Sequence, residues 1–175
     1  ASGEYPLVLK AIGRESGNKT ELGAVALGLA DADELLAAAD TMATRLREVG
    51  HGDDRWLVEQ VVPDAVTELI VGVVRDPACG PVLVIGSGGI LAELVHDTRT
   101  LLLPADHDAI RRAIASLSVG PLLFGYRASV CGDLAAAVEA CPAIGRFALP
   151  HADRIDALDL NPLLVPPLRL WAVTA

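Results

Sequence analysis

Two lysines and a threonine near the start of the chain have the residue types and spacing of a phosphate-binding site. Lys10 lies in a short apolar run, and Lys19 and Thr20 follow it in a glycine-bearing segment. A lysine in an apolar strand costs free energy unless an anion or a carboxylate meets it. A glycine-bearing loop can bring backbone N–H groups, an ammonium and a hydroxyl to one anion. The P-loop pattern G-x-x-x-x-G-K-[ST] is absent. We expect a phosphate-binding strand and loop; the alternative is a strand-edge lysine followed by a solvated loop.

Carboxylate and amide side chains later in the chain form a candidate magnesium site. Asp159 and Asn161 are two residues apart in an apolar run, so a strand would place both on the same face. Magnesium prefers hard oxygen ligands of this kind. Glu68 is a third candidate, and Glu93 and Asp97 are further acids in a glycine-rich setting. The alternative for Asn161, which a proline follows, is a turn that ends the strand.

A glycine turn and one arginine are further candidates for anion binding. The turn over residues 86–89 contains Gly88 and Gly89, which could present backbone N–H groups to an anion or merely turn the chain. Arg127 could pair with a phosphate or a carboxylate through two hydrogen bonds, or could be an ordinary surface arginine.

The elements that must position these residues alternate between strands and helices. Apolar runs bounded by glycine or proline predict strands, and apolar residues at helical spacing predict helices. Asp31 with Glu34 is typical of a helix start, and Pro142 should end or kink the last helix. We expect an α+β or α/β domain of two small lobes with mixed sheets. The expected strands cover residues 6–12, 24–29, 56–62, 68–74, 81–85, 90–95, 155–165 and 168–173, and the helices residues 31–49, 106–117 and 134–140.

These residues resemble the ATP-grasp domain of NDP-forming acyl-CoA synthetases. The resemblance covers nearly the whole chain in the family's order and approximate spacing. It rests on the segments YPLVLKAIG from Tyr5, NKTELGAVALGL from Asn18, ELIVGV from Glu68, GSGG from Gly86, GYR from Gly125 and LDLNPL from Leu158. It implies an ATP-grasp-like fold, with a partial nucleotide-binding lobe over residues 1–62 and a second lobe with metal and phosphate residues over 63–175. The strand and helix that open the first lobe in relatives are expected to be absent.

The resemblance also implies a function and a set of site residues. Such a domain binds ADP or ATP with Mg²⁺ and exchanges a phosphoryl group with a histidine of a CoA-binding partner, in cis or in trans. It is part of an ADP-forming acid–CoA ligase and is not complete on its own. The segment WLVEQVV resembles the strand that leads to the adenine and ribose. The implied catalytic residues are Lys10 and Arg127, the implied nucleotide-binding residues are Lys10, Lys19, Thr20, Glu59, Gln60, Glu68, Gly88 and Gly89, and the implied metal ligands are Asp159 and Asn161.

Two positions depart from the family's pattern. Asn18 stands where relatives commonly have a histidine, and an amide cannot carry a phosphoryl group. Thr174 stands where the family's last strand usually has an aspartate that binds magnesium. These departures keep open a catalytically degenerate sensor domain, for example one attached to an acetyltransferase, or a domain that serves only as an oligomerisation scaffold.

Composition limits the remaining possibilities. The chain has 175 residues, a net charge of −9 and 52% hydrophobic residues, so it is long enough to bury a core but is too acidic to favour nucleic acid or an anionic membrane. Its three cysteines have no metal-ligand spacing and are expected to be reduced thiols. No signal peptide or membrane-length apolar run is evident. We expect a soluble cytoplasmic protein whose partners are a nucleotide and a CoA-binding domain or subunit, in a homo- or hetero-oligomer.

Overall fold

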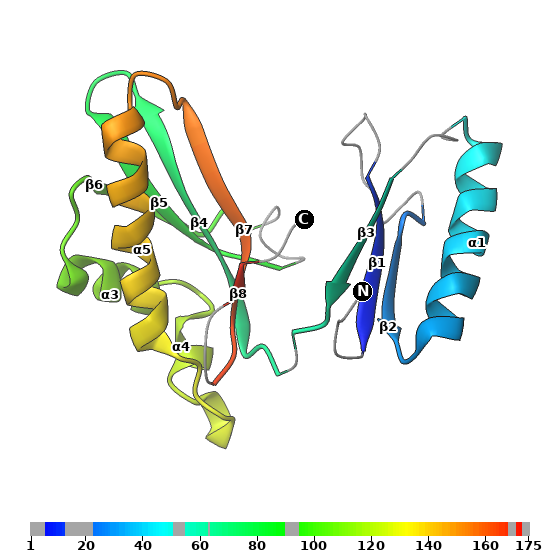
Figure 1. Ribbon diagram of the computed structural model, residues 1–175. Coiled ribbons are helices and arrows are strands. Elements are labelled where there is room, and N and C mark those ends of the chain that lie inside the picture. The colour runs from blue at the N-terminus through cyan, green and yellow to red at the C-terminus, as the bar shows by residue number, and fades with distance from the viewer. Residues whose placement is uncertain are drawn as a thin grey trace. The chain divides into compact units, whose positions relative to one another are not determined.

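The computed structural model describes residues 6–12, 23–50, 55–62, 64–89, 95–167 and 171–172. The chain divides into two compact units, Ala1–Val61 and Val62–Ala175. Each unit has its own antiparallel sheet and its own hydrophobic core (Figure 1). In the part of the chain that the structure describes, no helix is both long enough and apolar enough to cross a membrane.

The first unit is a three-stranded sheet with one helix on one of its faces. β1 (Leu7–Ile12) pairs antiparallel with both β2 (Val25–Leu29) and β3 (Arg55–Gln60), and α1 (Ala32–Glu48) follows β2. Because side chains alternate along a strand, every second residue of β1 meets the helix. The core of this unit contains Leu7, Leu9, Ala11, Ala24, Leu29, Met42 and Leu46.

The start of α1 is fixed by the two acidic residues that the sequence singles out. The Asp31 side chain accepts a hydrogen bond from the Glu34 backbone N–H at 2.9 Å. The Glu34 carboxylate in turn accepts one from the Ala30 backbone N–H at 2.8 Å. This reciprocal arrangement satisfies N–H groups that the first helical turn leaves open. The predicted helix start is confirmed.

The second unit is a five-stranded sheet in the order β6-β5-β4-β7-β8. β4 (Thr67–Asp76) lies at its centre and forms a hairpin with β5 (Gly80–Ser87), whose other neighbour is β6 (Thr98–Leu102). On the other side, β4 pairs with β7 (Ala157–Val165), which pairs with β8 (Trp171–Ala172). All of these pairs are antiparallel.

Among the described residues, helices cover one face of this sheet and none lies on the other face (Figure 1). They are α3 (His107–Ala115), the short α4 (Gly120–Leu123) and α5 (Leu134–Ala148). Single 3₁₀ turns follow α4 at Tyr126–Ala128 and α5 at Leu149–His151. We call the side of the sheet away from α3 and α5 the open face.

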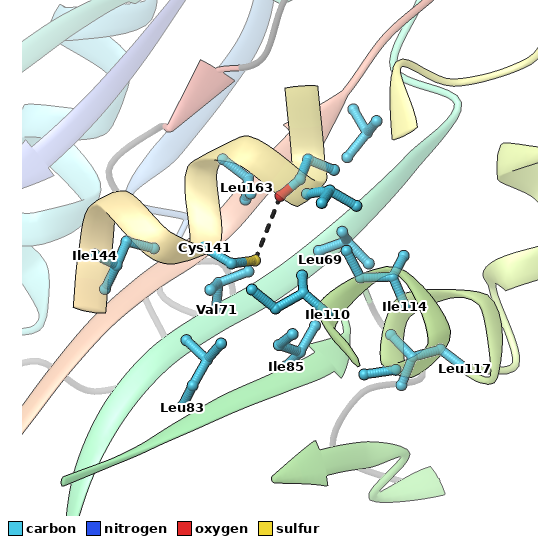
Figure 2. Packing of buried hydrophobic residues seen from close by; sticks show 14 of the residues in the cluster. Leu69, Val71, Leu83, Ile85, Ile110, Ile114, Leu117, Cys141, Ile144 and Leu163 are labelled. Carbon is cyan, nitrogen blue, oxygen red and sulfur yellow. Dashed lines mark hydrogen bonds between the residues drawn. The ribbon is translucent and has the colours of Figure 1, made fainter. Parts of the chain in front are cut away.

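The core of the second unit lies between the sheet and these helices (Figure 2). Its fully buried residues include Leu69, Val71, Leu83 and Ile85 from β4 and β5, and Ile110, Ile114 and Cys141 from α3 and α5. The Cys141 thiol donates a hydrogen bond to the Ala137 carbonyl at 3.3 Å, and its burial raises its pKa to about 12. All three cysteines are free, as the sequence predicts.

A bulge in β7 adjusts which side chains reach this core. Leu69 pairs with Leu163 and Val71 pairs with Leu160, so Asn161 and Pro162 together lie opposite Ile70. The extra residue reverses the alternation of the strand. Even-numbered residues before the bulge and odd-numbered residues after it can therefore both face the helices. The core side of β7 carries Leu158, Leu160, Leu163 and Val165.

The α+β class is confirmed, whereas one predicted helix end is wrong, one predicted strand lies almost wholly outside the described residues, and one observed strand was not predicted. The helix expected to end or kink at Pro142 runs on to Ala148, because burial of its later residues against the sheet outweighs the one backbone hydrogen bond that proline cannot make. The strand expected over residues 90–95 lies outside the described residues apart from Val95, whose backbone is helical. β6 was not predicted from the sequence, because it is short and begins with three polar residues.

Candidate functional site

In the first unit, Lys10 and Glu59 form an ion pair on the sheet face away from α1. The Lys10 Nζ lies 2.8 Å from the Glu59 Oε2, and the two side chains are only 15% and 20% exposed. Lys10 lies in β1 and Glu59 in β3, where Glu59 pairs with Val8, two residues before Lys10. This diagonal spacing is within reach of long side chains. The expectation that a carboxylate or anion must meet Lys10 is confirmed.

Gln60 does not join this pair. Its backbone pairs with Leu7, whose side chain belongs to the core beneath α1, whereas Glu59 pairs with Val8 on the opposite face. Adjacent residues of a strand point to opposite faces. Of the two polar residues that the sequence places near a ribose, the structure brings only Glu59 to the face that carries Lys10.

In the second unit, Glu68 lies directly against the glycine turn. The Gly88 backbone N–H donates a hydrogen bond to the Glu68 carbonyl at 2.8 Å. A Cβ at position 88 would lie 2.8 Å from the Glu68 Cβ and 2.9 Å from its carbonyl carbon, so only glycine fits. A Cβ at Gly89, where φ is +81°, would lie 3.8 Å from the Glu68 carboxylate. Glu68, Gly88 and Gly89, which the sequence predicts as one binding site, are therefore neighbours.

Asp159 and Asn161 are both exposed on β7, on the open face of the same sheet. Asp159 pairs with Gly72, which shares the face of Glu68 because the two are four residues apart on β4. A Cβ at Gly72 would lie 2.7 Å from the Leu158 carbonyl oxygen and 3.4 Å from the Asp159 Oδ1. The missing side chain at Gly72 lets Asp159 lie close over β4.

The donor set on the open face fits a divalent cation that also binds phosphate. Asp159 and Asn161 supply hard oxygens, and magnesium is typically held by one or two such groups together with phosphate oxygens and water. Among the described residues, no three His, Cys, Asp or Glu side chains form a metal-binding group, so the protein has no closed cage there. The Asp159 and Glu68 carboxylates would repel a phosphate group unless a bound cation neutralised part of this negative charge.

Arg127 lies in the segment that joins α4 to α5, with its backbone in the left-handed region at φ 52° and ψ 42°. Its guanidinium carbon lies 5.3 Å from the centre of the Tyr126 ring. The same segment ends against β7, where the Asp133 backbone N–H donates to the Pro166 carbonyl at 3.0 Å. This is the end of the sheet that carries Glu68, but none of the described contacts joins Arg127 to Glu68 or to Asp159.

Several predicted positions lie outside the described residues. They are Asn18, Lys19, Thr20, Glu93 and Thr174. Of the further acids, Asp97 is described. Its carboxylate accepts hydrogen bonds from the Ser87 hydroxyl, the Arg99 guanidinium and the Ser118 backbone N–H. The sequence marks Asp97 only as a further candidate acid for the metal site in a glycine-rich setting. No pattern in the sequence marks it as a structural acceptor, because its partners come from segments that only the fold brings together.

Comparison with known proteins gives the same family along the whole chain. The family model for the ATP-grasp domain matches residues 1–175. A trans-feruloyl-CoA synthase from an unknown prokaryotic organism is 34% identical over 167 residues, which are 93% of this chain and 23% of that protein. The beta subunit of an ADP-forming acetate–CoA ligase from Pyrococcus furiosus is 28% identical over 93% of this chain and 71% of the subunit. The chain thus spans less than a quarter of the first relative and most of the second.

Solved structures agree. A dinucleotide-forming acetyl-coenzyme A synthetase from Ca. Korarchaeum cryptofilum, in complex with coenzyme A, Ca-AMPCP and HgCl⁺, superposes with a TM-score of 0.85 at 27% identity, over 97% of this chain and 74% of that chain. A second structure of that synthetase contains coenzyme A and Mg-AMPPCP, with a phosphohistidine segment pointing towards the nucleotide-binding site; its TM-score is 0.83, at the same identity and coverage. The family resemblance found in the sequence is confirmed, and the chain belongs to the ATP-grasp domain family.

Proposed function

We propose that this chain is the nucleotide-binding domain of an NDP-forming acyl-CoA synthetase. It binds ADP or ATP with Mg²⁺ and exchanges a phosphoryl group with a histidine of a CoA-binding partner, which is a domain of the same protein or a separate subunit. The observation that carries the proposal is the arrangement on the open face, where Glu68, the glycine turn, Asp159 and Asn161 share one side of one sheet. The whole-chain family match supports it.

In the first unit, which we assign to the nucleotide-binding lobe at residues 1–62, Lys10 would bind phosphate oxygens. Its ammonium is already directed by the Glu59 carboxylate 2.8 Å away and is mostly withdrawn from water. A partly buried ammonium forms stronger charge-assisted hydrogen bonds than an exposed one. Glu59 would therefore hold Lys10 in place and could also reach the ribose. Lys19 and Thr20 would complete the phosphate contacts of this lobe.

In the second lobe, which we assign to residues 63–175, Asp159 and Asn161 would hold Mg²⁺. The bound cation would neutralise phosphate charge and so allow the nucleotide to approach a face that carries two carboxylates. Glu68 and the backbone of Gly88 and Gly89 would border the phosphates. The Gly88 N–H already donates to the Glu68 carbonyl, so the backbone N–H of the turn that a phosphate could meet would be that of Gly89.

The chain's own residues suit direct transfer rather than a relay. Asn18 cannot form a phosphoryl intermediate, because an amide nitrogen is not a nucleophile. In the synthesis of ATP, the P–N bond of the partner's phosphohistidine breaks as a P–O bond forms to the terminal oxygen of ADP. Lys10 and Arg127 would stabilise the charge of the transferred group. The partner would supply the acyl and CoA chemistry, so this chain would carry out only the nucleotide part of the reaction.

The test is ATP formation by this chain. The purified chain is mixed with ADP, Mg²⁺ and a phosphorylated CoA-binding subunit from a relative, and ATP is measured with luciferase. ATP that depends on the chain and on Mg²⁺ supports the proposal. Nucleotide binding without ATP formation would contradict the catalytic part and favour the sensor domain. Absence of nucleotide binding would contradict both and leave an interaction scaffold.

A further inference from the structure

The glycine turn is held from the helix side of the sheet by Asp97. The Asp97 side chain is only 8% exposed, and it lies just before β6. Its Oδ2 accepts a hydrogen bond from the Ser87 hydroxyl at 2.6 Å and another from the Ser118 backbone N–H. Its Oδ1 accepts one from the Arg99 guanidinium at 3.0 Å. One carboxylate therefore joins the end of β5, the start of β6 and the segment after α3.

Arg99 makes this arrangement rigid. Its guanidinium donates to the Ser116 hydroxyl at 2.8 Å and to the Ser116 carbonyl at 2.6 Å, in addition to Asp97. Ser116 ends α3, where exposed carbonyl groups attract a cation. Desolvation of Asp97 acts to raise its pKa, but the hydrogen bonds from Ser87, Ser118 and Arg99 outweigh it and hold the pKa below the ordinary value. The carboxylate therefore stays ionised and accepts three hydrogen bonds from the chain itself, so it acts as a structural acceptor and not as a ligand.

Ser87 connects Asp97 to the glycine turn on the open face. It is held twice, because its backbone N–H also donates to the Asp97 carbonyl at 3.0 Å. Ser87 pairs with Leu69, a core residue, so its side chain faces the helices, and the next residue, Gly88, donates to the Glu68 carbonyl. The turn is thus fixed between Asp97 on the helix side and Glu68 on the other.

We propose that Asp97 is a positioning residue for the nucleotide site: through Ser87 it sets the place of the Gly88–Gly89 backbone beside Glu68. The inference rests on the proposed function, because it assumes that this backbone borders the phosphates. Residues that orient metal ligands typically change metal affinity or activity by about 10- to 100-fold when they are removed, and we expect an effect at the lower end of this range for the turn.

The test compares two substitutions of nearly equal shape, Ser87→Val and Ser87→Thr. Valine lacks the hydroxyl that Asp97 accepts, and threonine keeps it. Two readouts are taken: amide hydrogen exchange at Gly88 in the nucleotide-free chain, and calorimetric titration of ADP with Mg²⁺. We expect Ser87→Val to speed exchange at Gly88 and to weaken ADP binding about tenfold. Ser87→Thr should match the wild type in both.

Two aspartate variants extend the test. Asp97→Asn replaces one acceptor oxygen with a donor and should behave like Ser87→Val. Asp106→Ala removes a comparable bond, from the Ala109 backbone N–H at 2.7 Å at the start of α3, but does not touch the turn. It should lower the melting temperature and leave ADP affinity within about twofold of the wild type. This change is well below the tenfold weakening expected for Ser87→Val.

The outcomes separate the two proposals. Unchanged exchange at Gly88 in Ser87→Val would overturn the positioning role, whatever happens to the nucleotide. Faster exchange with unchanged ADP affinity would also overturn it and would leave the proposed function standing. Failure of the wild-type chain to bind ADP would overturn the proposed function and, with it, the link from Asp97 to a nucleotide. Faster exchange at Gly88 together with weaker ADP binding in Ser87→Val, and wild-type values of both in Ser87→Thr, would establish the positioning role.

Discussion

The Gly88→Ala substitution should disturb the nucleotide site more than its size suggests. The added Cβ would lie 2.8 Å from the Glu68 Cβ and 2.9 Å from the Glu68 carbonyl carbon. Carbon atoms in ordinary contact are about 3.5–4.0 Å apart, so the turn must withdraw by about 0.7–1.2 Å. The hydrogen bond from the Gly88 N–H to the Glu68 carbonyl, now 2.8 Å, would then lengthen to about 3.5 Å or more and be lost.

The energetic cost follows from these two changes. Overpacking of this kind destabilises by about 1–3 kcal/mol, and the lost backbone hydrogen bond is worth about 1 kcal/mol. Because the obstructing atoms include backbone, no side-chain rotation relieves the contact. We expect urea unfolding to report a loss of about 2–4 kcal/mol, and ADP titration with Mg²⁺ to show weakened binding.

Gly80→Ala is the matched control. Gly80 forms the turn at the other end of the same hairpin, where φ is +78° and an added Cβ would meet nothing within 4 Å. Alanine there costs about 1–2 kcal/mol of backbone strain but leaves Glu68 in place. Its ADP affinity should equal that of the wild type. If Gly88→Ala binds ADP as tightly as Gly80→Ala, the turn does not border the nucleotide and the reasoning fails.

Three other substitutions or reagents give separate tests. Lys10→Met should weaken ADP binding by about 1.5–3 kcal/mol in calorimetry, the scale of a charge-assisted hydrogen bond, and an unchanged affinity would remove Lys10 from the site. Iodoacetamide at pH 8 should label the exposed Cys79 and Cys131 rapidly but Cys141 only on unfolding, because burial raises its pKa to about 12; rapid labelling at all three, seen by mass spectrometry, would contradict the core packing. Since the pKa of Asp97 is lowered in the folded chain, its stabilising effect is fully present above the ordinary value of 3.8 and is lost as pH falls through the lowered pKa. The stability advantage of wild type over Asp97→Asn in urea should therefore shrink below about pH 4, and a constant advantage would refute the assignment.

Local patterns predicted much of the fold because local physics decides it. The helix starting after Asp31 is specified by its capping residues and its apolar spacing, and both are visible in the sequence. The prediction at Pro142 was wrong because it considered only the local cost of a proline in a helix. The burial that keeps α5 helical to Ala148 depends on strands that are distant in the sequence. Tertiary packing decided that helix end.

The site was predictable in its residue types but not in its pairings. The spacing of Asp159 and Asn161 correctly placed both on one exposed strand face. The contact between Lys10 and Glu59 depends on the register of β1 and β3, which are separated by a helix and cannot be aligned from sequence periodicity. Asp97 likewise could not be assigned, because its partners come from three segments that only the fold brings together.

The most direct test of the central claim is calorimetric titration of ADP into this chain with and without Mg²⁺. The two carboxylates on the open face should repel the phosphates unless a cation is bound, so we expect binding that strengthens strongly when Mg²⁺ is present. Binding of equal strength without Mg²⁺ would contradict a metal site at Asp159 and Asn161. No binding under either condition would contradict a nucleotide site in this chain.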